Sequence, residues 1–154
     1  MTLTAGNDVP GVRAAQAPDR PPQAWLRESI GWLALEATRL TYERQPQLWK
    51  LGEYGRARTI EDFTHHLNAV VPADEARWRS HLRYSVTLFD LRGFPQHWLS
   101  DAFATLDGVL ESALPPEVTA AARGLLAAAP RMMTEIADAH GIDLHAPTRY
   151  DELR

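Results

Sequence analysis

The stretch TIEDFTHHLNAV, residues 59–70, places two carboxylates one helical turn before two adjacent histidines. Asp62 precedes His66 by four residues, so the two side chains can meet on one face of a helix. A carboxylate in this position can hold one imidazole nitrogen and direct the other towards a metal, a haem iron or another ligand. The alternative is a histidine at the edge of the apolar face that is hydrogen-bonded within its own helix. The stretch therefore contains one candidate ligand-binding histidine, with a purely structural role as the alternative.

The two neighbouring histidines are expected to point in different directions. Each residue of an α-helix is turned by about 100° from the one before it. On that geometry the apolar face is centred on Ile60, Phe63 and Leu67, and His65 lies nearly opposite. His66 lies on the flank of the apolar face. We therefore predict that His65 is solvated and that His66 points towards the core.

A third histidine, His81, follows Trp78 by three residues and precedes Leu82. This spacing places it on the flank of another buried helical face. If its helix packs antiparallel to the one that carries His66, across a short turn at Pro72, both imidazoles can approach a common cavity. His81 is thus the second candidate for ligand binding.

The motifs of known catalytic and metal sites are absent from the sequence. There is no His-Glu-x-x-His, no pair of Glu-x-x-His motifs, no Gly-x-Ser-x-Gly, no phosphate-binding loop, no Gly-x-Gly-x-x-Gly and no cysteine. The acidic pairs Glu61-Asp62 and Asp74-Glu75 are both expected at helix starts, where the helix dipole favours acids. We accordingly assign no catalytic residue and no metal site, and an enzymatic role is disfavoured.

Tryptophan is abundant, with five residues in a chain of 154. Large rings with one polar atom suit the wall of a cavity or an interface between subunits. Trp32 and Trp98 lie off the centre of their apolar stripes and are candidates for a pocket or a dimer face, and Trp78 joins them as a candidate cofactor contact. A core that is simply rich in tryptophan is the alternative.

Apolar spacing predicts helices throughout, and no strand or hairpin signal is present. The expected fold is an all-α, compact, single-domain bundle of about five or six helices. Residues 1–22 are expected to form a disordered arm, residues 23–143 the helical domain and residues 144–154 a tail. The predicted helices run from Pro22 to Pro46, from Thr59 to Pro72, from Asp74 to Gly93, from about Pro95 to Pro115, from Pro116 to Pro130, and from Met132 to His140. The segment QPQLWKLGEYG, residues 45–55, is expected to be a connector that covers one end of the core.

The composition limits the classes of partner that we expect for this protein. The net charge is −4, with acidic and basic residues interspersed, so the sequence lacks the basic stripe of a nucleic-acid-binding protein. The N-terminus has no secretory signal pattern, and no apolar run reaches the roughly 18 residues of a membrane span. We expect a cytoplasmic protein that binds neither nucleic acid nor membrane.

The segments GRARTIEDFTHHLNAVV and WRSHLRYSVTLFDLRGFPQHWLSDAFATLDGVLESALPPE resemble small bacterial helical domains of the sensor-globin and phycobilisome-like kind. The resemblance covers less than half of the chain and includes the Arg-Gly-Phe-Pro turn and the Leu-Pro-Pro break. It implies a globin-like regulatory module with an apolar pocket, with or without a tetrapyrrole, whose axial ligand would be His66 or, second, His81. There is no cysteine for covalent bilin attachment.

Three functional hypotheses follow from these observations. The first is a non-enzymatic sensory or adaptor domain with an aromatic-lined pocket for a small apolar ligand, or with an aromatic helix face that forms a homodimer. The second is a protein that binds haem or another tetrapyrrole. The third is a small helical enzyme that acts on an apolar substrate.

Overall fold

The computed structural model describes residues 22–153, and side chains from residue 24 onward. In this part of the chain the secondary structure is entirely helical, as predicted, with six α-helices and two short 3₁₀ segments. Their bounds are α2, Pro22–Glu28; α3, Ile30–Arg44; η1, Pro46–Leu51; α4, Gly52–Val70; α5, Glu75–Arg92; α6, His97–Ala113; α7, Pro116–His140; and η2, Asp151–Leu153.

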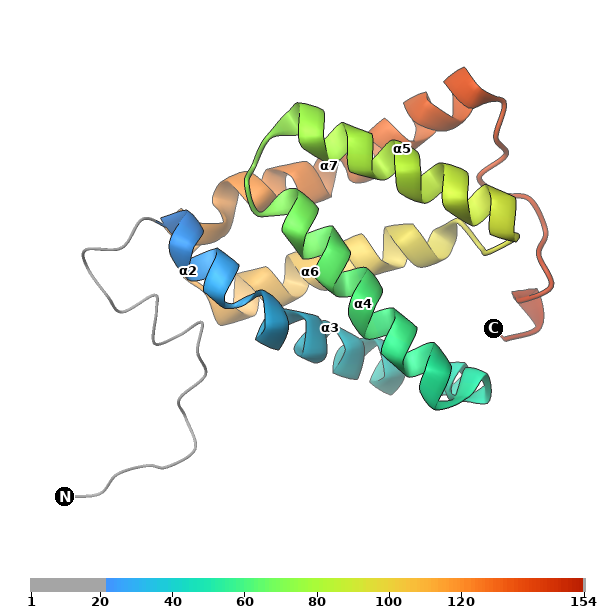
Figure 1. Cartoon of the computed structure of the whole chain (residues 1–154), viewed down its shortest axis with the longest axis horizontal. Helices are drawn as coiled ribbons and strands as arrows, with labels where there is room; N and C mark the ends of the chain where they lie inside the picture. Colours follow the sequence, from blue (N-terminus) through green and yellow to red (C-terminus); the bar gives the residue numbers. More distant parts are fainter. Residues whose placement is uncertain (1–21, 154) are drawn as a thin grey trace.

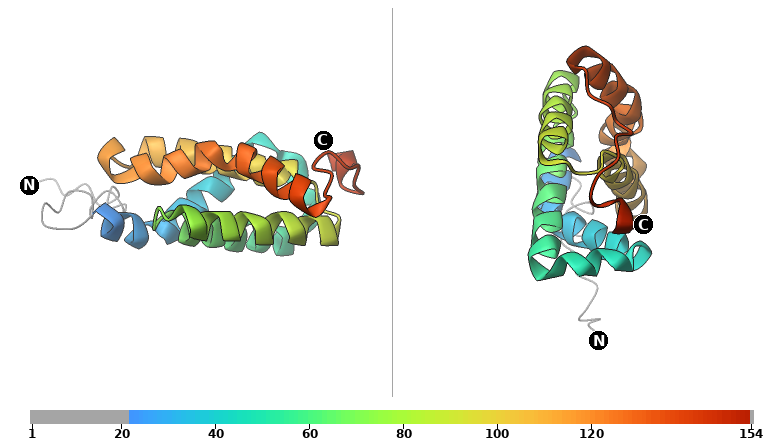
Figure 2. Two further views of the ribbon diagram at one scale, coloured as in Figure 1. Left: turned by 90° about the horizontal axis from the view of Figure 1, so that it is seen from above. Right: turned by 90° about the vertical axis from the view of Figure 1, so that its right-hand side faces the viewer.

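Five of the helices form a closed ring around the core. In the order α3, α4, α5, α7 and α6, each packs on the next, and α6 packs on α3 to complete the ring; α2 packs on α7 (Figure 1). Figure 2 shows the same arrangement from two other sides, with α4 and α5 opposite α6 and α7. Leucines from four of these helices are completely buried between them: Leu33, Leu67, Leu82, Leu106 and Leu110.

The prediction for α5 is confirmed at both ends. Asp74 caps the start, where its carboxylate accepts a hydrogen bond from the backbone N–H of Arg77 at 3.1 Å. Gly93 ends the helix with φ of 68°, a left-handed conformation in which glycine carries no steric penalty. Standard cap residues at both ends therefore made this helix predictable.

The predicted start of α4 at Thr59 is wrong, because the helix begins at Gly52. Gly52, with φ of 72°, turns the chain out of η1. A Cβ atom at position 55 would lie 2.6 Å from Cβ of Leu51, so Gly55 allows η1 to pack closely on α4. The Thr59 hydroxyl donates to the carbonyl of Gly55 at 3.0 Å inside the helix. The glycines that suggested a connector are thus part of the helix, and Glu61 and Asp62 do not lie at its start.

Two other boundaries also differ from the prediction. The first expected helix is divided at Ser29, whose hydroxyl donates to the carbonyl of Trp25 at 2.8 Å and competes with the backbone for this acceptor. The expected fifth and sixth helices are one helix, α7, with Pro130 inside it. The apolar face of α7 is buried on both sides of Pro130, and this packing outweighs the hydrogen bond that proline cannot donate.

The ends of the chain bear on the expected domain boundaries. Residues 1–21 of the predicted arm lie outside the described residues, and Pro22 is the first residue of α2. In the predicted tail, Leu144 packs against the core and the Tyr150 ring lies 5.2 Å from that of Trp98. The tail therefore contributes side chains to the packing of the bundle. No helix between residues 22 and 153 is long and apolar enough to cross a membrane.

Candidate functional site

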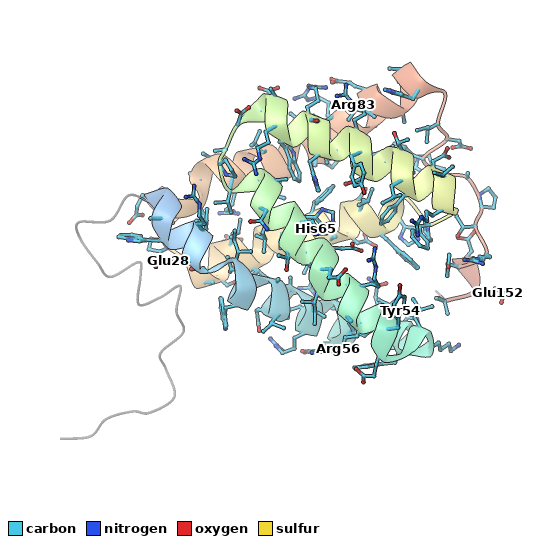
Figure 3. The ribbon with its side chains drawn as sticks, viewed as in Figure 1. Glu28, Tyr54, Arg56, His65, Arg83 and Glu152 are labelled. Carbon is cyan, nitrogen blue, oxygen red and sulfur yellow. The ribbon has the colours of Figure 1, made fainter. Side chains whose placement is uncertain are left out.

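The helix α4 places its two adjacent histidines in opposite environments, as the periodicity predicted. His65 is exposed midway along the helix (Figure 3), whereas only 5% of His66 is accessible to solvent. His66 lies on the side of α4 that faces α5 and α6. The direction of the helix face, rather than local composition, thus distinguishes the two residues.

His66 and His81 form a direct hydrogen bond across the α4–α5 interface. Nδ1 of His66 lies 2.8 Å from Nε2 of His81, so one ring donates its N–H and the other accepts. The Ser85 hydroxyl lies 3.4 Å from the same nitrogen of His81. The two imidazoles meet, but the cavity that they were expected to share is lined by His66 and not by His81. Neither alternative for His66 is found, because its partner is His81 on α5, not Asp62 and not another group of α4.

Two further rings hold this pair in place. Trp78 stacks on His81, with 5.5 Å between ring centroids and 23° between ring planes, and Phe103 meets His66 edge-on at 4.9 Å. Trp78 is fully buried, and its indole N–H donates to the carbonyl of Leu125 at 3.1 Å. We call His66, Trp78, His81 and Phe103 the inner cluster.

Burial sets the protonation state of the inner cluster. Burial is the largest cause that lowers the pKa of His66, and the charge that His81 would carry lowers it further. Burial also lowers the pKa of His81, with a smaller contribution from His65. Both imidazoles are therefore neutral at pH 7, so each has one N–H donor and one acceptor nitrogen.

A cavity of about 100 Å³ lies beside His66, between α3, η1, α4, α5 and α6. This volume corresponds to several water-sized spheres, enough for a small organic molecule. Its aromatic walls are Tyr42, Phe63, Phe89 and Trp98; its aliphatic walls are Leu48, Leu51, Leu99 and Ala102; and its polar groups are Thr41, Gln45, Thr59, Asp62, His66, Asp101 and Thr105. We refer to it as the His66 cavity.

The structure brings together some of the predicted site residues and separates others. Asp62, His66 and Trp98 line the His66 cavity. His81 and Trp78 do not line the cavity. His81 contacts His66, which does, and Trp78 contacts His81 and Phe103. Trp32 lies elsewhere, in a groove between α3 and α6. Trp32 and Trp98 therefore do not share one face, and the dimer that they were expected to form stays a prediction.

A second group of rings lies beside the cavity at the start of α6, where Phe89 and Trp98 line the cavity and two further rings pack behind them. Phe94 lies 5.4 Å from Phe89 and 6.0 Å from Trp98, and Tyr150 packs on Phe94 and Trp98 at 5.5 and 5.2 Å between ring centroids. We call Phe89, Phe94, Trp98 and Tyr150 the outer cluster. One of its rings comes from the tail, which the sequence did not connect to the site.

Several lining residues were not identified from the sequence. Tyr42, Phe89 and Asp101 come from three different helices, and nothing in their local spacing marks them as neighbours of His66. One available signal was the apolar character of the connector, because Leu48 and Leu51 of that segment do line the cavity. The remaining residues depend on how distant helices pack.

The histidine pair can pass a proton through the wall of the cavity. His66 lines the cavity, and His81 lines an open groove between α4 and α5 with His65, Arg77 and Tyr84. When a proton binds the outer nitrogen of one ring, the shared hydrogen can shift between Nδ1 of His66 and Nε2 of His81, and a proton can leave from the outer nitrogen of the other ring. Within residues 22–153, no three His, Asp or Glu side chains converge into a set of metal ligands.

Comparison with known proteins gives no relative to which this site can be referred. No protein-family model, no curated protein and no solved structure matches the chain. The case for a function therefore rests on the His66 cavity and the residues around it.

Proposed function

We propose that this chain is a non-enzymatic sensory or adaptor domain that binds a small, largely apolar molecule in the His66 cavity. The observation that carries the proposal is the cavity itself, in which four aromatic side chains and several aliphatic ones surround a few polar groups. Small-molecule sites in proteins combine apolar walls with a few placed polar groups in this way. The ring of helices supplies a rigid frame for such a site.

His66 supports this proposal because one of its nitrogens is available to a ligand. Nδ1 is engaged with His81, and Nε2 has no hydrogen-bond partner among residues 22–153. Its contacts with Phe103 and His81 fix the orientation of the ring. A fixed ring that offers one nitrogen provides directional recognition without the entropy cost of ordering a mobile side chain.

The size of the cavity favours a small ligand over a tetrapyrrole. A volume of about 100 Å³ accommodates a single aromatic ring with a short substituent, whereas a haem is several times larger. Titration of the protein with haemin is expected to give no Soret shift. A shift that disappears in His66→Ala would instead favour the haem alternative.

Thermal unfolding in the presence of 2-phenylethanol tests the proposal. A ligand that binds only the folded state raises the melting temperature as its concentration exceeds Kd. Ala102 lines the cavity, and Ala104 lies exposed on the same helix. Ala102→Trp is expected to fill the cavity and remove the shift, whereas Ala104→Trp is expected to retain it.

Circular dichroism verifies that both variants are helical before their melting temperatures are compared. Equal shifts in the two variants would place the ligand outside the cavity and contradict the proposal. The absence of a shift in the unmodified protein, with this ligand and with the two related compounds used below, would contradict it as well.

A further inference from the structure

The charged groups on the walls of the His66 cavity are acidic. Asp62 and Asp101 line it, and no lysine or arginine is among its lining residues in the described chain. Asp101 is half exposed and lies 3.2 Å from Nδ1 of His97. Asp62 differs, because it forms no hydrogen bond or ion pair with any residue from 22 to 153. Among the described residues, the cavity thus contains one carboxylate that forms neither a hydrogen bond nor an ion pair.

The surroundings of Asp62 explain why it has no hydrogen-bond or ion-pair partner in the described part of the chain. Arg58, one turn earlier on α4, pairs with Glu61 at 3.0 Å. His65, one turn later on α4, forms no hydrogen bond with Asp62 and acts on it only through its charge. Burial is the largest cause that raises the pKa of Asp62, and the charges of Arg58 and His65 lower it less than burial raises it. The folded protein therefore holds this carboxylate at a cost in stability, which a positively charged ligand would reduce.

The other walls of the cavity are compatible with a cation. The aromatic walls Tyr42, Phe63, Phe89 and Trp98 present rings, whose π-faces attract cations. His66 is neutral, so it does not repel a positive charge. In the tautomer whose Nδ1 donates to His81, its Nε2 can accept a hydrogen bond from an ammonium group. Together these walls provide a negative charge, π-faces and an acceptor around a mainly apolar space.

We propose that the ligand of the His66 cavity is a small primary amine with an apolar body, whose ammonium group pairs with Asp62. The apolar body lies among the aromatic and leucine side chains. This inference rests on the proposed function, because it names the ligand class of the same cavity. It also assigns Asp62, rather than His66, as the residue that decides which ligands bind.

Three compounds of similar shape test the inference: phenethylamine, 2-phenylethanol and phenylacetate. They carry a positive charge, no charge and a negative charge at pH 7. Isothermal titration calorimetry with the full chain is expected to give a Kd for phenethylamine at least tenfold lower than that for 2-phenylethanol, and the weakest binding for phenylacetate. Equal affinity for the amine and the alcohol would overturn the inference and leave the proposed function standing. Binding of none of the three would overturn both.

Asp62→Asn, which keeps the shape of the side chain, shows whether the preference comes from this carboxylate. The ratio of amine to alcohol affinity is expected to fall from at least tenfold to about one. Asp138→Asn is the matched control. Asp138 is an exposed carboxylate on α7 outside the cavity, and this substitution changes the net charge by the same amount as Asp62→Asn. A ratio that is unchanged in Asp62→Asn, or that falls equally in both variants, would overturn the role of Asp62.

A second measurement on the same two variants needs no ligand. Because the folded state holds the charged form of Asp62 unfavourably, Asp62→Asn is expected to melt at a higher temperature than the unmodified protein. Asp138→Asn is expected to melt at the same temperature. A lower melting temperature for Asp62→Asn would mean that the Asp62 carboxylate stabilises the fold and is not held available to bind a cation.

Discussion

The inner and outer clusters are built from the same kinds of side chain, yet they differ in how their rings are held. Every ring of the inner cluster comes from an α-helix, and Trp78 at its centre is completely buried. The outer cluster is partly exposed, and one of its rings, Tyr150, comes from the segment after the last α-helix. The comparison indicates that the inner cluster supports the fold and holds His66 in position, while the outer cluster supports one wall of the cavity with rings that are less enclosed.

The largest expected effect is that of Trp78→Ala in the inner cluster. Removal of this ring leaves a cavity between α5, α6 and α7 and removes the indole hydrogen bond to Leu125, so the free energy of unfolding is expected to fall by about 3–5 kcal/mol. Chemical denaturation measures this loss. Trp98→Ala in the outer cluster is the comparison, with a smaller loss because its ring is partly exposed; equal losses would remove the distinction between the clusters.

The next effect is a pH dependence that belongs to the inner cluster. Folding lowers the pKa of His81 from 6.5 to about 4 and that of His66 to about 3. Below pH 6.5 the unfolded chain therefore binds more protons than the folded protein. The folded state is fully stable above that pH, and it loses stability as the pH falls towards the pKa values of the folded protein. Between pH 7 and pH 5 the free energy of unfolding is expected to fall by about 2 kcal/mol or more.

His81→Gln is expected to flatten this pH dependence. Asp62 acts in the opposite direction, because a raised pKa adds stability as the pH falls through its folded value. An unchanged pH profile in His81→Gln would assign the acid sensitivity to other groups.

A smaller effect is expected for Tyr150→Ala in the outer cluster. The ring packs against Phe94 and Trp98, and such aromatic pairs contribute about 0.5–1.5 kcal/mol each. A loss of about 1 kcal/mol in the free energy of unfolding, together with weaker binding in the His66 cavity, is expected. Tyr84→Ala, at a ring that is 65% exposed, provides the control. Identical behaviour of the two variants would show that the tail does not support the cavity.

The smallest effect is expected for His65→Ala. His65 is exposed, and substitutions of this kind usually change stability by less than about 0.5 kcal/mol. Calorimetry with phenethylamine is expected to give the same Kd as for the unmodified protein. His66→Ala, one position along, is expected to weaken binding markedly. Equal binding by the two variants would show that His66 takes no part in binding the ligand.

The sequence predicted those parts of the fold that local chemistry decides. The all-α class, the capped ends of α5 and the opposite directions of His65 and His66 each follow from spacing or from a cap residue. Wrong boundaries arose where tertiary packing overrides a local signal. Gly55 is a helix breaker by propensity but permits the contact with Leu51, and Pro130 lies in a helix whose apolar face is buried on both sides.

The site was predictable to the same extent. Asp62, His66 and Trp98 were selected from helical periodicity and do line one cavity. The bond from His66 was assigned to Asp62, its neighbour on the same helix, whereas a residue on the next helix occupies that nitrogen. Tyr42 and Tyr150 could not be assigned, because their contribution depends on contacts between segments that are far apart in the chain.

The short link between α4 and α5, residues 71–74, has a consequence for the order of folding. His66 and His81 are 15 positions apart, so little chain entropy is lost when the two helices come together. The cavity, by contrast, is lined by residues between 41 and 105, and Tyr150 packs on one of its walls through Trp98. We expect the α4–α5 pair to form early and the cavity wall to close late, so that backbone amides at the start of α6 and in the tail exchange hydrogen sooner than those of α4. Local opening of that wall would then be the route by which a ligand enters.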